Sequence, residues 1–208
     1  AGALDLATLD QVSRRTLRQT RRHYLDSVEA VLGAPLAGRV HLDKNPNHTG
    51  LLPAILRLFP ESRIVFALRD PRDVITSCVL RSFALTEFSA MLLDWETAVD
   101  LYEAEMGAWL RYRDALRPGS WIETRYEDTV ADPMAEVRRI LPVLGLGWDD
   151  RISQYRTRTE NKIVNSPTQT EVRQPVHKRA VGRWQSYERF LEPHMPRLEP
   201  FLRSFGYA

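Results

Sequence analysis

The sequence predicts an α/β protein in which helices flank a central parallel sheet. Its 208 residues alternate candidate strands with candidate helices over short connections, a pattern typical of parallel strands joined by crossover helices. Residues 64–68, Ile-Val-Phe-Ala-Leu, form a continuous apolar run of the kind found in a strand that is covered on both faces. Because 43% of the residues are apolar, the chain can bury a full core, and we expect one domain over residues 1–208.

The first part of the chain predicts helix, strand, helix and strand in that order. Residues 8–32 carry apolar side chains at helical spacing and end at Gly33, a residue that commonly follows a helix. Residues 39–42 predict a short strand, and residues 51–59 predict a helix that ends before a proline. Residues 63–69 predict the second strand.

The second strand passes into a helix within two residues. Arg69 stands where the strand must end, Asp70 can cap a helix, and Pro71 suits the first turn of that helix. We expect the helix to reach Arg81. Because a helix amino end attracts negative charge, the junction predicts an anion site.

Further helices surround a third predicted strand. Residues 86–116 predict long helices, residues 121–126 a strand, and residues 133–144 a helix ended by glycine. Residues 156–179 are polar with few periodic apolar positions, which predicts an ordered functional loop. A last helix, which carries Trp184, completes the chain.

The charges of the chain are unevenly placed, although its formal net charge is only +2. Residues 151–189 hold nine Lys or Arg against three Glu, and residues 82–110 hold six acids and no base. The basic stretch predicts one wall of an anion-binding cleft, and the acidic stretch predicts a solvated helix face. The small net charge and the lack of a recognised module argue against nucleic acid as a partner.

Cysteine usage and hydropathy bound the location of the protein. The single cysteine, Cys78, is interpreted as a core residue and fits a reducing compartment. No apolar run approaches the roughly 20 residues of a membrane span, and the first residues lack a signal-peptide pattern. We expect a cytoplasmic protein. We expect no metal, since no histidines and carboxylates stand at ligand spacing.

Polar side chains stand at the ends of all three predicted strands. They are Lys44, Arg69 and the pair Arg125–Tyr126. In open parallel sheets, ligands bind beyond the carboxyl ends of the strands, so these residues are candidates for one site.

The helix after Arg69 adds candidates for the same site. Asp73, Ser77 and Arg81 follow at intervals of four and share one helix face. The residues assigned to the core face are Val74, Ile75, Cys78 and Val79. Arg69, Ser77 and Arg81 can therefore converge on a phosphate. The alternative is a surface ion pair of Asp73 with Arg81 and an uninvolved serine.

Four segments resemble those of the sulfotransferases, especially bacterial ones related to tyrosylprotein sulfotransferases. The segments are LDKNPN, FPESRIVFALRDPRDVITS, TRYEDTVADP and VRQPVHKRAVGRWQSYE. The resemblance extends from about residue 40 to residue 207, in the same order. It implies a three-layer fold similar to that of P-loop kinases, and 3′-phosphoadenosine 5′-phosphosulfate (PAPS) as the sulfuryl donor.

The resemblance also implies which residues bind the donor nucleotide. Arg69 and Ser77 would hold the 3′-phosphate with help from Arg81, and Tyr126 would lie against the adenosine. The segment 172–184 would close over the nucleotide. Its two basic residues assigned to the 3′-phosphate are Lys178 and Arg179.

Three residues are candidates for the chemical step. By resemblance, Lys44 is the catalytic lysine, whose cation can stabilise charge on the leaving group. Thr168 aligns with a serine that assists this lysine in the relatives. His48, four residues beyond Lys44, has a suitable intrinsic pKa for a general base, the alternative being a structural histidine.

The main departure from the family pattern concerns the glycine-rich loop that cradles the 5′-phosphosulfate. The chain contains no G-x-x-x-x-G-K-[ST] motif, and it has no glycine between Ala3 and Leu32. Either the protein truly lacks the loop or the printed chain is amino-terminally incomplete. We expect the second, because a sheet without its central strand would leave two unpaired edges.

The predicted reaction is in-line transfer of a sulfuryl group from PAPS to a hydroxyl or amine, leaving adenosine 3′,5′-bisphosphate. Peptide, carbohydrate, lipid and secondary-metabolite acceptors all remain open, as does the oligomeric state. The alternatives are a nucleotide kinase of related architecture and a non-catalytic module that binds a nucleotide or an anionic glycan.

Overall fold

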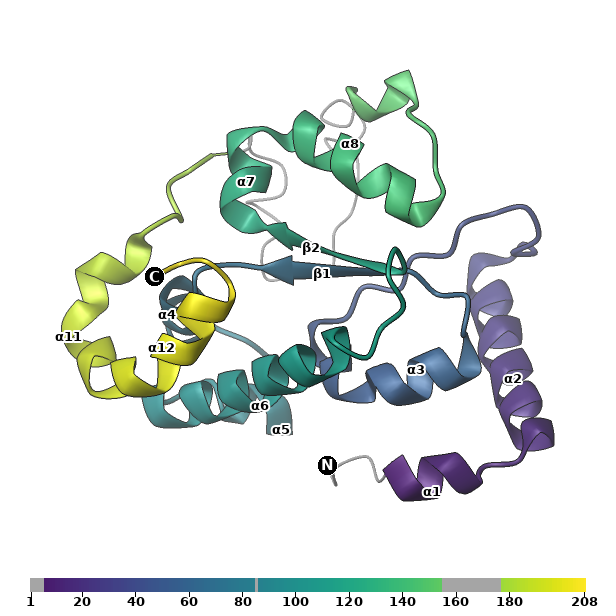
Figure 1. Ribbon diagram of the computed structural model, residues 1–208, viewed down its shortest axis with the longest axis horizontal. Helices are drawn as coiled ribbons and strands as arrows, with labels where there is room; N and C mark the ends of the chain where they lie inside the picture. Colours follow the sequence, from purple (N-terminus) through teal and green to yellow (C-terminus); the bar gives the residue numbers. More distant parts are fainter. Residues whose placement is uncertain (1–5, 85, 155–176) are drawn as a thin grey trace. The chain divides into compact units, whose positions relative to one another are not determined.

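In this computed structural model, which describes residues 6–84, 86–154 and 177–208, two parallel strands form a sheet. Strand β1 (Ile64–Leu68) pairs with β2 (Trp121–Arg125), and Leu68 lies opposite Arg125 (Figure 1). Both strands and their parallel pairing were predicted from the sequence, and they are confirmed. Because the strands are in register, Arg69 and Tyr126 follow them at the same edge of the sheet.

The sheet belongs to one of two compact units, which consists of Arg63–Gly107 and Leu116–Ala208. Strand β1 leads into α4 (Pro71–Val79), and β2 leads into α7 (Tyr126–Ala131) and α8 (Pro133–Leu144). The other helical elements are α5 (Glu87–Ala90), α6 (Trp95–Arg113), η2 (Asp150–Ile152), η3 (Arg183–Tyr187), α11 (Glu188–Leu191), η4 (Glu192–His194) and α12 (Met195–Ser204). The last residues of α6 group with the other unit.

The other unit is built from helices near the amino end. They are α1 (Leu6–Gln11), α2 (Arg14–Leu32), η1 (Pro46–Leu51) and α3 (Leu52–Leu58). The single helix predicted over residues 8–32 is interrupted, because the Ser13 side chain accepts a hydrogen bond from the amide of Thr16 and starts α2 anew. Helix α2 ends at Gly33, whose φ of 63° is the left-handed conformation.

The strand predicted over residues 39–42 is wrong. These residues have no regular secondary structure, and Val40 and Leu42 are 70% and 78% exposed. A strand needs a neighbour that accepts its backbone hydrogen bonds, and none is recorded for this segment among the described residues. Side chains hold the segment instead, because the hydroxyl of Tyr24 bonds to His41 Nε2 and to Asp43 Oδ2, each at 2.9 Å.

Local capping and proline also shortened several predicted helices. Helix α4 ends at Val79 rather than Arg81, and residues 86–116 divide where Asp94 accepts hydrogen bonds from the first amides of α6. The last predicted helix divides into η3, α11, η4 and α12. Prolines in the first turns of η4 and α12 explain this division, because proline cannot donate the hydrogen bond that would continue a helix.

The core of the sheet-bearing unit lies where α12 meets α4 and α6. Ile75, Val99, Leu191, Leu198 and Leu202 are almost completely buried. One arginine reinforces this packing: the Arg197 guanidinium of α12 binds three carboxylates of α6. They belong to Glu96, Asp100 and Glu103. Within the described ranges, no helix has both the length and the apolar character of a membrane span.

Helix α8 has the bounds that its caps predict. The Asp132 side chain accepts hydrogen bonds from the amides of Met134 and Ala135, Pro133 fills the first turn, and Gly145 ends the helix at φ 69°.

We therefore expect Asp132→Ala to lower the free energy of unfolding by about 1 kcal/mol, because two helix amides lose their acceptor. Urea unfolding followed by circular dichroism measures this change. The matched control is Asp132→Asn, which keeps a side-chain acceptor and should stay close to the wild type. Equal losses in both variants would contradict the capping role.

Candidate functional site

The junction between β1 and α4 is filled by carboxylates of the protein itself. Asp70 accepts a hydrogen bond from the Arg72 amide at 2.9 Å and binds the Arg72 guanidinium through both carboxylate oxygens. The Asp70 amide donates to Glu127 Oε1 at 3.1 Å. These two amides, which the sequence suggested for an external anion, are thus satisfied internally, so the capacity to bind an anion falls on side chains.

Arg69 lies at the centre of the site and is partly engaged by the protein. Its Nη2 atom donates to the carbonyl oxygen of Ala180 and lies 3.5 Å from Asp73 Oδ2. Its guanidinium carbon lies 4.8 Å from the ring centroid of Tyr126. Its Nε atom is buried and has no hydrogen-bond partner among the described residues. A buried donor of this kind can serve an anionic acceptor.

The spacing of Asp73, Ser77 and Arg81 predicted that they share one helix face. In the structure, the Asp73 side chain is buried against another segment of the chain. Asp73 is only 1% exposed, and its carboxylate accepts hydrogen bonds from the backbone amides of Gly182 and Trp184 at 2.8 and 2.9 Å. Helix α4 therefore binds the backbone of a segment more than a hundred residues away. No local sequence signal indicated this, because both donors are backbone groups.

Ser77 and Arg81 lie near the other end of α4. Ser77 is half-buried, and its hydroxyl makes no hydrogen bond to a residue that the structure describes.

Cys78 is half-buried, as are Val74 and Val79, so only Ile75 of the predicted core face is fully buried. Burial raises the pKa of the Cys78 thiol, while the positive charges of Arg81 and Arg69 partly offset this rise.

The segment after residue 176 carries the other predicted cations. Lys178 and Arg179 are exposed and belong to a turn in which the Val181 amide donates to the Lys178 carbonyl at 3.0 Å. Gly182 has a φ of 71°, which a residue with a side chain rarely adopts. The Arg72 guanidinium lies 4.1 Å from the ring centroid of Trp184 and fixes the end of the segment. Thr168 and most of the predicted functional loop lie outside the described residues.

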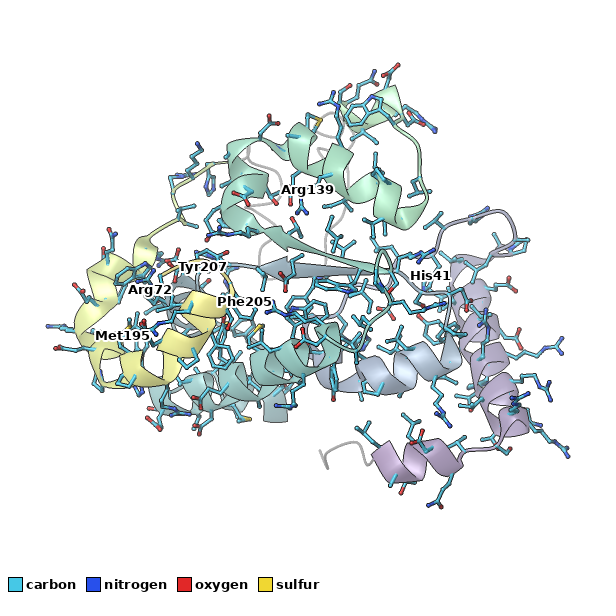
Figure 2. All side chains as sticks on the ribbon, in the orientation of Figure 1. His41, Arg72, Arg139, Met195, Phe205 and Tyr207 are labelled. Carbon is cyan, nitrogen blue, oxygen red and sulfur yellow. The ribbon has the colours of Figure 1, made fainter. Side chains whose placement is uncertain are left out.

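The carboxyl end of the chain holds the two strand ends together, which sequence reasoning missed. The Tyr207 hydroxyl donates to Glu127 Oε2 at 2.7 Å. The Tyr207 backbone carbonyl accepts from Arg72 at 3.3 Å, and these two residues are labelled in Figure 2. Arg125 lies 4.0 Å from the Tyr207 ring centroid and donates to the Gly206 carbonyl. Burial and the contact with Glu127 raise the pKa of Tyr207, although Arg125 opposes this rise.

Lys44 and His48 belong to the amino-terminal unit and are described within it. Lys44 is exposed in the irregular segment that follows the contacts of Tyr24 with His41 and Asp43. His48 is half-buried in η1. Burial and the hydrogen bond to Asp43 raise the pKa of Tyr24. The Tyr24 contacts thus fix the backbone that leads into Lys44.

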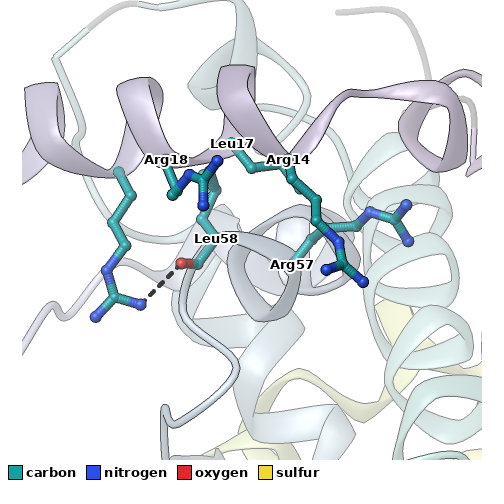
Figure 3. Close-up of a pocket in the computed structure, with 6 residues that line it drawn as sticks. Arg14, Leu17, Arg18, Arg57 and Leu58 are labelled. Atoms are coloured by element: carbon teal, nitrogen blue, oxygen red, sulfur yellow. Dashed lines mark hydrogen bonds between the residues drawn. The ribbon is translucent and has the colours of Figure 1, made fainter.

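A basic hollow of about 290 Å³ lies between α2 and α3 (Figure 3). Its lining consists of two leucines and four arginines: Leu17, Leu58, Arg14, Arg18, Arg21 and Arg57. Arg21 forms an ion pair with Glu61, and Arg57 forms one with Asp10 at 2.6 Å. Because carboxylates neutralise half of its arginines, we interpret this hollow as a solvated surface. Within the described ranges, no three His, Cys, Asp or Glu side chains gather as metal ligands would.

These features define a class of protein. Parallel strands end in an arginine and a tyrosine that lie together, and a basic segment is bound against the following helix, as in an α/β protein that binds an anionic ligand at its strand ends. The profile of the sulfotransferase family matches residues 5–150. The chain therefore belongs to the sulfotransferase family, as the sequence motifs suggested.

Proteins from bacteria and a nematode are similar over most of the chain. The omega-hydroxy-beta-dihydromenaquinone-9 sulfotransferase of Mycobacterium tuberculosis is 30% identical over 161 residues, which is 71% of this chain and 40% of that enzyme. Protein-tyrosine sulfotransferase A of Caenorhabditis elegans is 25% identical, over 72% of this chain and 40% of that protein. A protein of Aquifex aeolicus is 28% identical, over 88% and 23% respectively. The chain spans less than half the length of these relatives.

The contacts of Tyr207 lead to a stability prediction. Tyr207→Phe keeps the ring against Arg125 but removes the donor to Glu127, so we expect a loss of about 1 kcal/mol in the free energy of unfolding. Denaturant unfolding measures this loss. Tyr112→Phe is the matched control, because its hydroxyl bonds to no described residue. If both variants unfold at the same urea concentration, the Tyr207 hydroxyl does not hold the strand ends.

Proposed function

We propose that the protein transfers a sulfuryl group from PAPS to the hydroxyl group of an acceptor. Membership of the sulfotransferase family and the names of the mycobacterial and nematode relatives support this activity. The P-loop-like, three-layer arrangement that the motifs imply belongs to the same proposal.

One observation about the site carries the donor assignment. Arg69 is held at the end of β1 by Ala180 and Asp73, yet its Nε atom is buried without an acceptor among the described residues. A preorganised guanidinium with a free donor suits a doubly charged phosphate, because it needs little reorganisation to bind one. The Ser77 hydroxyl, also without a partner among the described residues, can add a second donor.

The remaining nucleotide contacts follow from the family motifs. Arg81 would assist at the 3′-phosphate, and Tyr126 would lie against the adenosine. The proximity of the Tyr126 ring to Arg69 supports a shared site for the base and the phosphate. Lys178 and Arg179, exposed on the segment bound by α4, would supply further positive charge.

The chemical step is a direct displacement at sulfur. The acceptor oxygen forms a bond to sulfur while the bond from sulfur to the bridging phosphate oxygen breaks, and the acceptor proton passes to a base. Lys44 would stabilise the negative charge that develops on the leaving phosphate, with Thr168 assisting. His48 is the candidate base, in keeping with its position four residues after Lys44. The protein mainly supplies positioning and charge stabilisation.

We infer that the acceptor carries a hydroxyl group, and the names of the relatives favour a lipid or a peptide over a carbohydrate or a secondary metabolite. The names of the relatives specify a hydroxylated menaquinone in one case and protein tyrosine in the other. Both are hydroxyl acceptors. Residues 86–109, an acidic and aromatic stretch in which Arg197 binds three of the carboxylates, are the region in which we expect acceptor contacts to vary.

We expect the protein to bind adenosine 3′,5′-bisphosphate more tightly than adenosine 5′-monophosphate, and Arg69→Ala to remove most of this preference. A charged hydrogen bond contributes about 1.5–3 kcal/mol, so the preference should fall roughly tenfold to a hundredfold. Isothermal titration of the full-length protein measures both affinities. Arg203→Ala, on the exposed side of α12, is the matched control and should keep the preference. Equal affinities in the wild type would refute the donor site.

For Lys44→Ala, we expect kcat to fall about a hundredfold or more while the affinity for adenosine 3′,5′-bisphosphate changes little. The reason is that charge grows on the leaving oxygen mainly in the transition state. Initial-rate kinetics of the full-length protein with PAPS check this, with Lys44→Arg as a variant that keeps the charge. A change in nucleotide affinity with unchanged kcat would assign Lys44 to binding instead.

A further inference from the structure

We propose that Asp73 is a positioning residue that holds the segment 178–184 against α4 and thereby places its cations at the nucleotide 3′-phosphate. This inference rests on the proposed function, because it assigns part of the preference for a 3′-phosphorylated nucleotide to a residue that does not touch the nucleotide.

The contacts of Asp73 occupy its whole carboxylate. Oδ2 accepts from the Gly182 amide at 2.8 Å and lies 3.5 Å from Arg69 Nη2, while Oδ1 accepts from the Trp184 amide at 2.9 Å. The side chain has no exposed surface. A buried carboxylate without partners would be very unfavourable, so the position of this charge and the position of the segment depend on each other.

Arg69 binds the same segment as Asp73, but as a hydrogen-bond donor instead of an acceptor. We call these contacts of Asp73 and Arg69 with the backbone of the segment a clamp. Asp73 accepts hydrogen bonds from the amides of Gly182 and Trp184, while Arg69 donates to the carbonyl of Ala180. The segment is therefore held through its backbone, at three residues close together in the sequence. Such a clamp depends on backbone geometry rather than on side-chain identity.

The segment also carries the two cations of the proposed site, Lys178 and Arg179, which are exposed. Lys178 and Arg179 precede Gly182 by only four and three residues, and the hydrogen bond from the Val181 amide to the Lys178 carbonyl closes the turn between them. Fixing Gly182 therefore restricts where Lys178 can reach. Asp73 itself is negative and would repel a phosphate, so its effect on binding must act through the groups that it holds, which are the segment and Arg69. A variant that strains the segment and leaves the contact between Asp73 and Arg69 unchanged separates these two routes.

The test is Asp73→Asn in the full-length protein. The asparagine has nearly the same size, but one acceptor oxygen becomes an NH₂ donor that faces a backbone N–H, and the ion pair with Arg69 is lost. We expect faster hydrogen exchange at the amides of Gly182 and Trp184. We also expect the preference for adenosine 3′,5′-bisphosphate over adenosine 5′-monophosphate to fall about tenfold, with the monophosphate affinity changed less than about twofold.

The control is Asp128→Asn, the same chemical change at an exposed carboxylate of α7. It should leave both the exchange rates and the nucleotide preference at wild-type values. A thermal unfolding scan of each variant identifies any variant that fails to fold. Gly182→Ala is the second variant, because a side chain at φ 71° strains the segment without altering α4, and it should lower the preference in the same way.

The outcomes separate this inference from the proposed function. If the wild type shows no preference for the 3′-phosphorylated nucleotide, the proposed function fails, whatever the variants do. If the wild type shows the preference and faster exchange in Asp73→Asn or Gly182→Ala leaves it intact, Asp73 has only a structural role. Rapid exchange at Gly182 and Trp184 in the nucleotide-free wild type would also overturn the inference.

Discussion

The buried carboxylate of Asp73 is the constraint on which the site depends. A negative charge with no exposed surface needs hydrogen-bond donors, and here the donors are two backbone amides of one distant segment and one guanidinium of the adjacent strand end. The partners of this single group thus join the end of β1, α4 and the segment 178–184, which includes the start of η3. The position of Arg69 follows from the same group, since the arginine binds both Asp73 and the segment that Asp73 holds.

The edge of the sheet is crowded with charges that largely neutralise one another. Asp70 binds Arg72, Glu127 binds the Asp70 amide and the Tyr207 hydroxyl, and the carboxyl end of the chain packs against Arg125. Such pairing orients the side chains, which reduces the reorganisation needed when a charged ligand binds. For the proposed sulfuryl transfer this matters, because a loose transition state asks the protein mainly for fixed positions and fixed charges.

Candidate residues at the site were accessible from the sequence to different degrees. Arg69 and Tyr126 could be paired in advance, because residues that follow parallel neighbouring strands meet at one edge. The partners of Asp73 could not, since its donors are backbone amides that carry no residue signature. The contribution of Tyr207 was hidden for a different reason: its contacts span 80 residues or more, and nothing local marks this tyrosine as a partner of the strand ends.

The sequence by itself determined the elements that local chemistry specifies. The apolar run of β1 predicted a strand, Asp132 with Pro133 and Gly145 predicted both ends of α8, and the family motifs identified a sulfotransferase. Tertiary structure alone decided which polar groups face inward and whether an extended segment finds a partner. The spacing of Asp73 placed it on a helix face with Ser77 and Arg81, whereas the folded chain buries its carboxylate. Residues 39–42, which were predicted to form a strand, have no strand partner among the described residues. Capping and periodicity act within a few residues, whereas burial and strand pairing depend on groups that the chain brings together only when it folds.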